Sequence, residues 1–117
     1  MVNLSIGTFN VKKLANDKKR KEIFYWLKGK KMNIYFLKDT HCNNETELKF
    51  QSDWGEKCIF SNKISQSAGV MILFNSNFDN EIEDYIKEND GRFFIYILKV
   101  NNEKILLANY YGLNFTF

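Results

Sequence analysis

Proline is absent from this 117-residue sequence, histidine occurs once, and there are only two cysteines. No Pro-, Gly- or Ser-rich linker, internal repeat or low-complexity segment is present. Cys42 and Cys58 lie in a chain that opens without a signal-peptide pattern, so they are expected to be reduced thiols. The sequence also lacks an apolar run long enough for a membrane helix. We therefore expect a nuclear or cytoplasmic protein with no membrane partner.

Aromatic residues, in contrast, are abundant, with eleven Phe, six Tyr and two Trp. Hydrophobic residues make up 44% of the chain and charged residues 26%, which is typical of a folded globular protein and not of a disordered one. The length fits a single small domain. The net charge of +3 is compatible with nucleic acid as a partner but does not require it.

The first 40 residues predict a strand–helix–strand unit. Alternating residues over 3–9 indicate a strand, and a helix with apolar residues at helical spacing follows. Asn16 or Asp17 is its expected N-cap, and Gly29 lies near its expected end. The unbroken apolar run over 34–37 predicts a strand buried on both faces, as in a parallel pair covered by a helix. The solvent side of the helix is expected to carry Lys18, Lys19, Arg20, Lys21 and Lys28.

The remainder of the chain predicts one short helix and five strands. The helix is expected over 43–50, and the strands over 57–60, 69–74, 81–87, 92–100 and 104–111. The strand over 81–87 is expected near a sheet edge. Asn89–Gly91 predicts a turn, and Asn101 and Asn102 predict a tight hairpin between the last two strands.

Polar residues end both strands of the first unit, since Asn10 closes one and Asp39 the other. The carboxyl ends of parallel strands meet at one sheet edge, where open α/β sheets place their ligands. A Mg²⁺ ion held by a carboxylate and waters, with amide and tyrosine groups that orient a phosphate, suits phosphodiester hydrolysis. Asp39 would then be the metal ligand, and Asn10 and Tyr111 the positioning groups. Tyr111 belongs to a polar cluster with Asn109 and Asn114.

Structural interpretations of the same residues remain open. An Asp-Thr pair after a strand is most often a turn or a helix N-cap, and spacing alone favours that interpretation of Asp39. His41 alone is more often a structural side chain than a catalyst. A zinc site built from His41, Cys42 and Cys58 lacks the paired ligand spacing of closed tetrahedral sites. The basic side of the first helix is usually only a solvated face.

Several segments, taken in order, resemble the endonuclease/exonuclease/phosphatase superfamily. They are SIGTFNVKKL, the basic amphipathic helix, NIYFLKDTHC, SQSAGVMILF, ENDGRFFIYI and LLANYYGLN. The likeness is greatest to the endonuclease domain of LINE-type retrotransposons, which is related to apurinic-site endonucleases. It covers residues from about 4 to 114 of a single domain spanning 1–117. The resemblance implies a Mg²⁺-dependent nuclease that nicks DNA, with an α/β fold built as a four-layer αββα sandwich.

The resemblance also implies site residues. Asn10 takes the place of the asparagine at the metal and phosphate, and Asp39 that of the metal-binding glutamate. Tyr111 matches the phosphate-contacting tyrosine, and His41 matches a histidine typical of the LINE branch. Asn114 closes the tyrosine segment and is expected at the phosphate. Gly69 and Gly91 match family glycines that look structural.

The sequence departs from the family pattern in three places. Lys38 replaces a glutamine and would oppose a cation, Asp39 is one methylene shorter than glutamate, and Leu113 replaces a proline. The Asp-x-Asn and Asp-His segments of the family's second half have no counterpart. We therefore expect the N-terminal half of the sandwich: one mixed sheet covered by helices on one face, with the partner sheet missing. Little or no nuclease activity is expected from this chain alone.

Partners and alternatives follow from the same observations. DNA is the expected partner of the complete domain, and the uncovered sheet face would need the second half of the domain or self-association. One alternative is a non-catalytic α/β domain that binds a protein, with Lys12, Lys13 and the basic helix contacting nucleic acid. A second alternative keeps the superfamily but makes the chain a phosphoesterase with another substrate.

Overall fold

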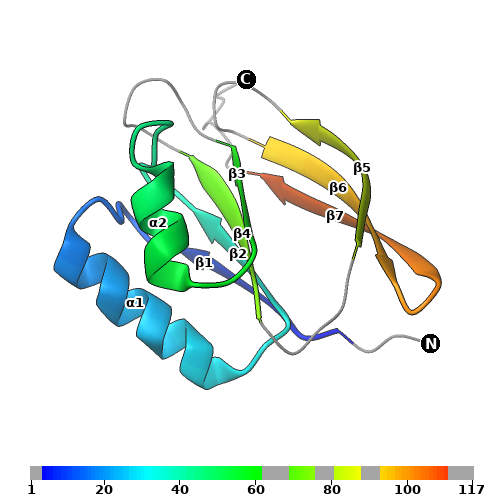
Figure 1. Ribbon diagram of the computed structural model, residues 1–117, viewed down its shortest axis with the longest axis horizontal. Helices are drawn as coiled ribbons and strands as arrows, with labels where there is room; N and C mark the ends of the chain where they lie inside the picture. The colour runs from blue at the N-terminus through cyan, green and yellow to red at the C-terminus, as the bar shows by residue number, and fades with distance from the viewer. Residues whose placement is uncertain (1–3, 62–68, 76–80, 88–92, 111–117) are drawn as a thin grey trace, which may run out of the picture.

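The first three elements form the predicted crossover unit in the computed structural model, which describes residues 4–61, 69–75, 81–87 and 93–110 (Figure 1). β1 (Ile6–Asn10) and β2 (Ile34–Lys38) pair in parallel, and α1 (Asp17–Lys30) connects them. Asn16 is the N-cap, because its Oδ1 accepts a hydrogen bond from the Lys19 N–H at 2.9 Å. The helix runs just past Gly29 and ends where Lys31 adopts a left-handed conformation with φ 58°.

The predicted short helix and five strands are also present. They are α2 (Glu47–Trp54), β3 (Cys58–Ser61), β4 (Val70–Phe74), β5 (Glu81–Lys87), β6 (Phe93–Val100) and β7 (Glu103–Tyr110). Asn101 and Asn102 form the hairpin between β6 and β7 with φ of 49° and 67°, as a primed turn requires. The turn predicted at 89–91 lies outside the described residues.

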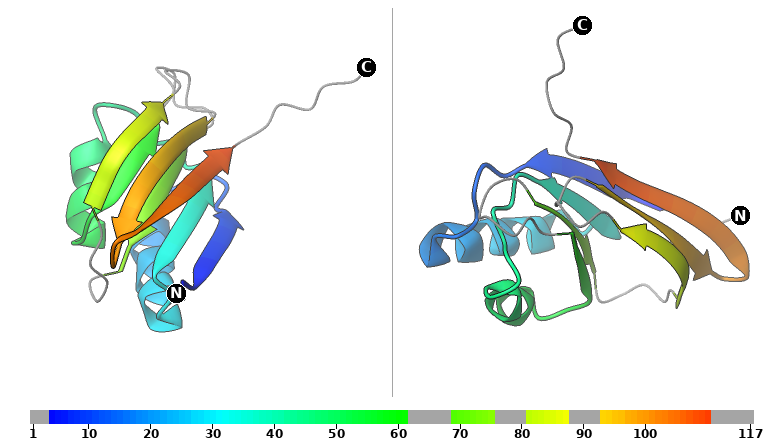
Figure 2. Two further views of the ribbon diagram at one scale, coloured as in Figure 1. Left: turned by 90° about the vertical axis from the view of Figure 1, so that its right-hand side faces the viewer. Right: turned by 90° about the horizontal axis from the view of Figure 1, so that it is seen from above.

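The strands make two sheets, so the expectation of a single sheet with a missing partner was wrong. A four-stranded mixed sheet has the order β1-β2-β4-β3, and a three-stranded antiparallel sheet has the order β5-β6-β7, with β5 at an edge as expected. Figure 2 shows three layers: both helices on one face of the four-stranded sheet, and the three-stranded sheet on its other face. The α/β class and the sandwich arrangement are confirmed. The error arose because the β6–β7 hairpin has an apolar face of its own, which packs back on the first sheet.

The core between the helices and the four-stranded sheet is rich in aromatic side chains. Its largest fully buried members are Trp54, Tyr35, Phe24 and Phe50. The Trp54 indole N–H donates to the Phe74 carbonyl at 3.0 Å, and the Trp54 ring meets the Phe24 and Tyr35 rings edge-on. Much of the aromatic content therefore serves this layer.

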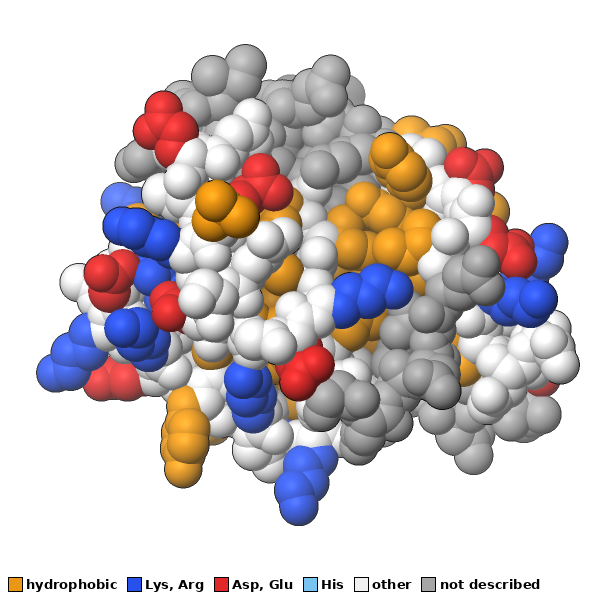
Figure 3. All heavy atoms as spheres, viewed as in Figure 1, with side chains coloured by type: hydrophobic (Ala, Val, Ile, Leu, Met, Phe, Trp, Pro, Cys, Tyr) orange, Lys and Arg blue, Asp and Glu red, His pale blue; other side chains and the backbone are white. Residues whose placement is uncertain are grey.

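The core between the two sheets is mostly aliphatic. The four-stranded sheet contributes Ile34, Ile72 and Phe74, and the three-stranded sheet contributes Leu98 and Leu107. Hydrophobic side chains are visible between the sheets on the side of β3 and β5 (Figure 3). The described part of the chain contains two helices, and neither is long and apolar enough to cross a membrane.

Candidate functional site

The register of β1 and β2 brings Asn10 and Asp39 to one edge of the sheet. Asn10 lies opposite Lys38, the last residue of β2, and Asp39 follows directly. The chains continue side by side beyond the strands, since the N–H groups of Val11 and Lys13 donate to the carbonyls of Lys38 and Asp39 at 3.0 and 2.8 Å. The predicted neighbourhood of the amide and the carboxylate is therefore present in the backbone.

This edge contains four residues with left-handed backbone conformations that only glycine adopts without strain. The φ angles of Lys12, Lys13, Asp39 and His41 are 47°, 72°, 60° and 56°. Such residues persist where surrounding contacts over-determine them, and they cluster at functional sites. Here the two loops are held together by backbone hydrogen bonds, so the geometry of the edge is set by both loops together.

The Asp39 carboxylate is bound by the imidazole of His41. His41 Nε2 lies 2.5 Å from Asp39 Oδ1, and both side chains are largely shielded from solvent. Because a carboxylate only accepts, Nε2 carries the proton and donates. The contact leaves Oδ2 of Asp39 free of His41. His41 is thus placed to hold the carboxylate in one orientation.

Asn10 is exposed, and its side chain is turned back onto the loop. Its Oδ1 accepts a hydrogen bond from the Lys12 N–H at 3.1 Å. In the described part of the chain no partner is recorded for the Asn10 amide NH₂, which has two donors to offer. The Lys12 and Lys13 side chains are exposed beside it. An anion at this edge would meet an amide donor and two ammonium groups.

Thr40 anchors the loop that carries Asp39 and His41, a role that the sequence did not predict. Its side chain is fully buried, its N–H donates to the Gly69 carbonyl at 3.1 Å, and its Oγ1 accepts from the Cys42 N–H. Gly69 has φ 96°, and a Cβ there would lie 2.7 Å from Thr40 Oγ1. Gly69 is therefore structural, as expected, because no larger residue fits against Thr40.

The end of β7 lies at the same side of the molecule as this edge. Figures 1 and 2 show β1, β2 and β7 running toward the same end, and β7 packs against β2. β7 ends at Tyr110. Tyr111 and Asn114, which the sequence placed at the phosphate, lie outside the described residues, as do Gly91 and Leu113.

The donor set at the edge suits a hard cation. Asp39 offers a carboxylate and Asn10 an amide, and Mg²⁺ is commonly held by one or two carboxylates and several waters. Within residues 4–61, 69–75, 81–87 and 93–110, no group of three or more His, Cys, Asp and Glu side chains could hold a metal ion. Cys42 and Cys58 are free thiols, and burial raises the pKa of each to about 12. Protonated thiols are poor metal ligands.

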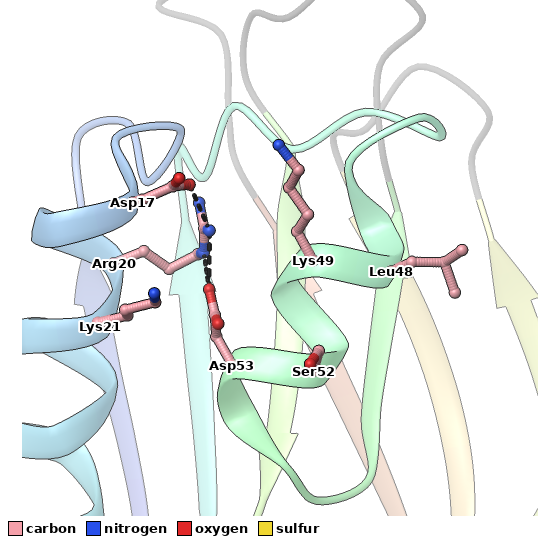
Figure 4. Close-up of a pocket in the computed structure, with 7 residues that line it drawn as sticks. All are labelled: Asp17, Arg20, Lys21, Leu48, Lys49, Ser52 and Asp53. Atoms are coloured by element: carbon pink, nitrogen blue, oxygen red, sulfur yellow. Dashed lines mark hydrogen bonds and ion pairs between the residues drawn. The ribbon is translucent and has the colours of Figure 1, made fainter.

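A groove of about 340 Å³ lies away from this edge, between α1 and α2 (Figure 4). Arg20 lines this groove. The sequence predicted that Arg20 would lie on the solvent side of the helix, but its side chain is buried. Arg20 donates to Asp53 and Asp17 at 2.7 Å each and to the Leu14 carbonyl at 3.0 Å, and it lies over the Phe50 ring. Its hydrogen bond and charge hold the pKa of Asp17 below the usual range. This network joins the two helices and is structural.

Comparison with known proteins finds similarity both in sequence and in structure. No family model matches the sequence. A Xenopus laevis protein described as "Transposon TX1 uncharacterized 149 kDa protein" is 25% identical over 109 residues, which cover 93% of this chain and 8% of that protein. The human Nocturnin catalytic domain, solved with a bound sulfate anion, superposes with a TM-score of 0.62 and 13% identity. The superposition covers 90% of this chain and 47% of that one, so this chain spans a small part of the first relative and about half of the second.

Nocturnin belongs to the endonuclease/exonuclease/phosphatase superfamily, and its likeness to this chain lies in the fold. The transposon protein supplies the likeness in sequence, along nearly the whole chain. The predicted resemblance is therefore confirmed: the chain has the endonuclease/exonuclease/phosphatase-type fold, and its sequence is related to that of a transposon protein.

Proposed function

We propose that the ends of β1 and β2 form part of a Mg²⁺-dependent phosphodiesterase site that acts on DNA. The observation that carries this proposal is the in-register parallel pairing, which brings the end of β1 at Asn10 next to the loop of Asp39, whose carboxylate is held by His41 at 2.5 Å. The fold it shares with Nocturnin supports phosphoester chemistry, and the transposon relative supports DNA over other phosphoesters. The sulfate in the Nocturnin structure has the shape and charge of a phosphate group.

Some residues of this edge would bind the cation, and others would bind the phosphate. Asp39 would hold Mg²⁺ with help from Asn10, and the ion would neutralise charge that develops on the phosphate. His41 orients the carboxylate through Oδ1, as hydrogen-bonded partners of metal ligands commonly do. The Asn10 NH₂ and Tyr111 orient the phosphate, with Asn114 at the end of the same segment. Lys12 and Lys13 neutralise charge along the DNA backbone.

We further propose that the 117-residue chain by itself has little or no nuclease activity. Its one histidine is bound to Asp39, and the described residues contain no group of three or more His, Cys, Asp and Glu side chains that could hold a metal ion. A group that activates the attacking water and a full set of charge-stabilising groups are each worth orders of magnitude in rate. Lys38, which adjoins Asp39 at the end of β2, also works against a bound cation.

A second candidate function is a domain that binds a protein partner. The observation in its favour is the outer face of the three-stranded sheet, where Ile86 and Leu106 are 63% and 65% exposed. Exposed apolar side chains that gather on one face favour association. Such a partner could be further protein sequence or a second copy of this chain.

Cation binding tests the site directly. Mn²⁺, which is chemically close to Mg²⁺ and paramagnetic, should broaden the backbone NMR signals of residues 38–41 and 10–13 before those of other residues. Asp39→Asn should abolish this broadening. Asp84→Asn is the matched control, because Asp84 is an exposed acid on β5 whose side chain accepts only a local backbone hydrogen bond. Equal broadening in the two variants would overturn the cation site.

Plasmid nicking tests the second part of the proposal. With Mg²⁺ present, the chain should convert supercoiled plasmid to the nicked form no faster than Asp39→Ala does. Robust nicking that Asp39→Ala abolishes would contradict the proposed inactivity and at the same time support the assignment of Asp39.

A further inference from the structure

Two aromatic side chains stand exposed on the second half of α1. Tyr25 is 83% exposed and Trp26 is 49% exposed. Tryptophan is on average a well-buried residue, so a half-exposed ring next to an exposed tyrosine is unusual. Trp26 is also held in place, because its ring meets the Phe9 ring edge-on with the centroids 5.4 Å apart. The indole therefore presents a fixed, half-open surface.

An open groove of about 370 Å³ adjoins these rings and is lined by Tyr25, Trp26, Gly29 and Lys30. Gly29 lies one turn beyond the aromatic pair, and no atom comes within 4 Å of the place where its Cβ would be. The missing side chain leaves the rings accessible along the helix. The Lys30 ammonium lies over the Trp26 ring, 4.3 Å from its centroid.

The face of the helix that carries Tyr25 is basic. Lys18, Lys21, Tyr25 and Lys28 recur at helical spacing on one face, and all four are exposed. The acids of α1 are Asp17 and Glu22, and Asp17 is already paired with Arg20. Figure 3 shows basic side chains on the helix side of the molecule, interspersed with acidic ones. The distance along the helix from Lys18 to Lys30 is about 18 Å at 1.5 Å per residue. At about 3.4 Å per nucleotide, the rise along one strand of a duplex, that distance corresponds to about five stacked nucleotides.

We propose that this surface, which we call the α1 platform (Lys18, Lys21, Tyr25, Trp26 and Lys30), binds single-stranded nucleic acid; Lys28 is not part of it, because its ammonium lies over the Trp54 ring, 5.1 Å from the centroid. Bases stack on Tyr25 and Trp26, and the lysines contact the phosphates. A base that enters the groove takes the place of the Lys30 ammonium over the indole, and this ammonium then pairs with a phosphate. Aromatic faces beside a basic track are the two features that single-strand binding surfaces combine.

The exposed ring faces favour a single strand over a duplex or a protein. Bases in a duplex are already stacked on one another, so a duplex would use the lysines and leave the rings without a role. The positive charge along the helix complements a polyanion. The aromatic pair lies on the second half of α1, which runs away from the strand-end edge (Figure 1), and no residue of the platform belongs to the proposed cation site. The inference therefore stands independently of the proposed cation site.

Tryptophan fluorescence tests the platform, because the chain has one half-exposed indole and one that is fully buried, Trp54. The full chain is titrated with oligothymidylate at low salt and without divalent cations, and a labelled oligonucleotide gives the affinity by anisotropy. Quenching is expected, and Trp26→Phe, which keeps a ring against Phe9, should remove it. Tyr25→Ala should weaken binding roughly 5- to 100-fold, as expected for loss of one stacked base.

Matched controls come from the three-stranded sheet. Tyr85 is 59% exposed on β5, and Lys104 is exposed on β7. Tyr85→Ala and Lys104→Gln should leave the affinity within twofold, whereas Lys30→Gln should lower it. Oligouridylate in parallel distinguishes RNA from DNA as the source of the strand. The proposal is overturned by absence of binding, by equal affinities of Tyr25→Ala and Tyr85→Ala, or by tighter binding of a blunt duplex of the same length.

Discussion

The two sheets of this molecule share one core but differ in what covers their other faces. The four-stranded sheet is covered by α1 and α2, with Trp54, Phe24 and Phe50 fully buried. The outer face of the three-stranded sheet carries Ile86 and Leu106, both mostly exposed, and no described helix covers it. The helix side therefore supplies most of the buried aromatic packing, whereas the second sheet depends on its contact with the first.

The largest effect is expected from truncating the central aromatic residue of the helix side. Trp54→Ala should lower the free energy of unfolding by about 3–5 kcal/mol, because it leaves a large cavity and removes the indole hydrogen bond to the Phe74 carbonyl. Leu106→Ala, on the outer face of the second sheet, should cost less than about 0.5 kcal/mol. Urea denaturation followed by circular dichroism measures both. Equal losses would refute the difference between the two faces.

The second-largest effect on stability is expected from the Arg20 network that joins the two helices. Arg20→Met should destabilise the fold by about 3 kcal/mol, since it removes a buried guanidinium and leaves the Asp53 carboxylate without its charged partner. Lys21→Met, the adjacent and solvent-exposed position, should change the unfolding free energy by less than about 0.5 kcal/mol. Denaturant titration of the two variants side by side measures this difference. Equal unfolding midpoints would show that Arg20 is solvated like Lys21 and that the network does not stabilise the fold.

The thiols report on the same helix-side core. Burial raises the pKa of Cys42 and of Cys58 from 9.0 to about 12, so both stay protonated at pH 8. The folded chain should therefore react with a thiolate-directed reagent much more slowly than the chain in urea. Because the folded pKa lies above the unfolded one, the associated stability is complete below about pH 8.5 and is lost as the pH rises toward 12. Equal reaction rates in the folded and unfolded chain would contradict this burial.

The smallest effect on stability is expected from changing the outer face itself. Leu106→Glu combined with Ile86→Lys should alter the free energy of unfolding by less than about 1 kcal/mol, because both side chains are mostly in water. Self-association of the chain should fall at the same time. Analytical ultracentrifugation over a range of concentrations compares the variant with the parent chain. If the variant and the parent chain are both monomers at every concentration, a second copy of this chain does not cover the outer face of the three-stranded sheet.

Much of the fold was predictable because its elements are local. The alternation over β1, the helix cap and the apolar run of β2 are each contained in a few residues; both strands were predicted, and the cap was narrowed to Asn16 or Asp17, of which Asn16 is the one observed. The burial of Arg20 was not predictable. It depends on Asp53, which lies 33 residues away on another helix.

At the candidate site the sequence placed Asn10 and Asp39 together through the rule for parallel strands. It did not show that His41 holds the Asp39 carboxylate, because that contact requires left-handed backbone at both residues, stabilised by the neighbouring loop. Thr40 was missed for the same reason, since its role depends on Gly69 in a distant segment. The sequence pattern of an amphipathic helix did not predict that Tyr25 and Trp26 are both exposed. Only the exposed fraction of each side chain in the structure shows this.

The sequence by itself determined the order and kind of the elements, the parallel unit at the start of the chain, and the family that it resembles. These features rest on periodicity, capping and turn residues, which act over a few positions. Only the tertiary structure decided that a second sheet covers the first, that Arg20 is buried, and that Asp39 and His41 form a pair. Those outcomes arise from contacts between segments far apart in the chain, where burial and packing outweigh local preference.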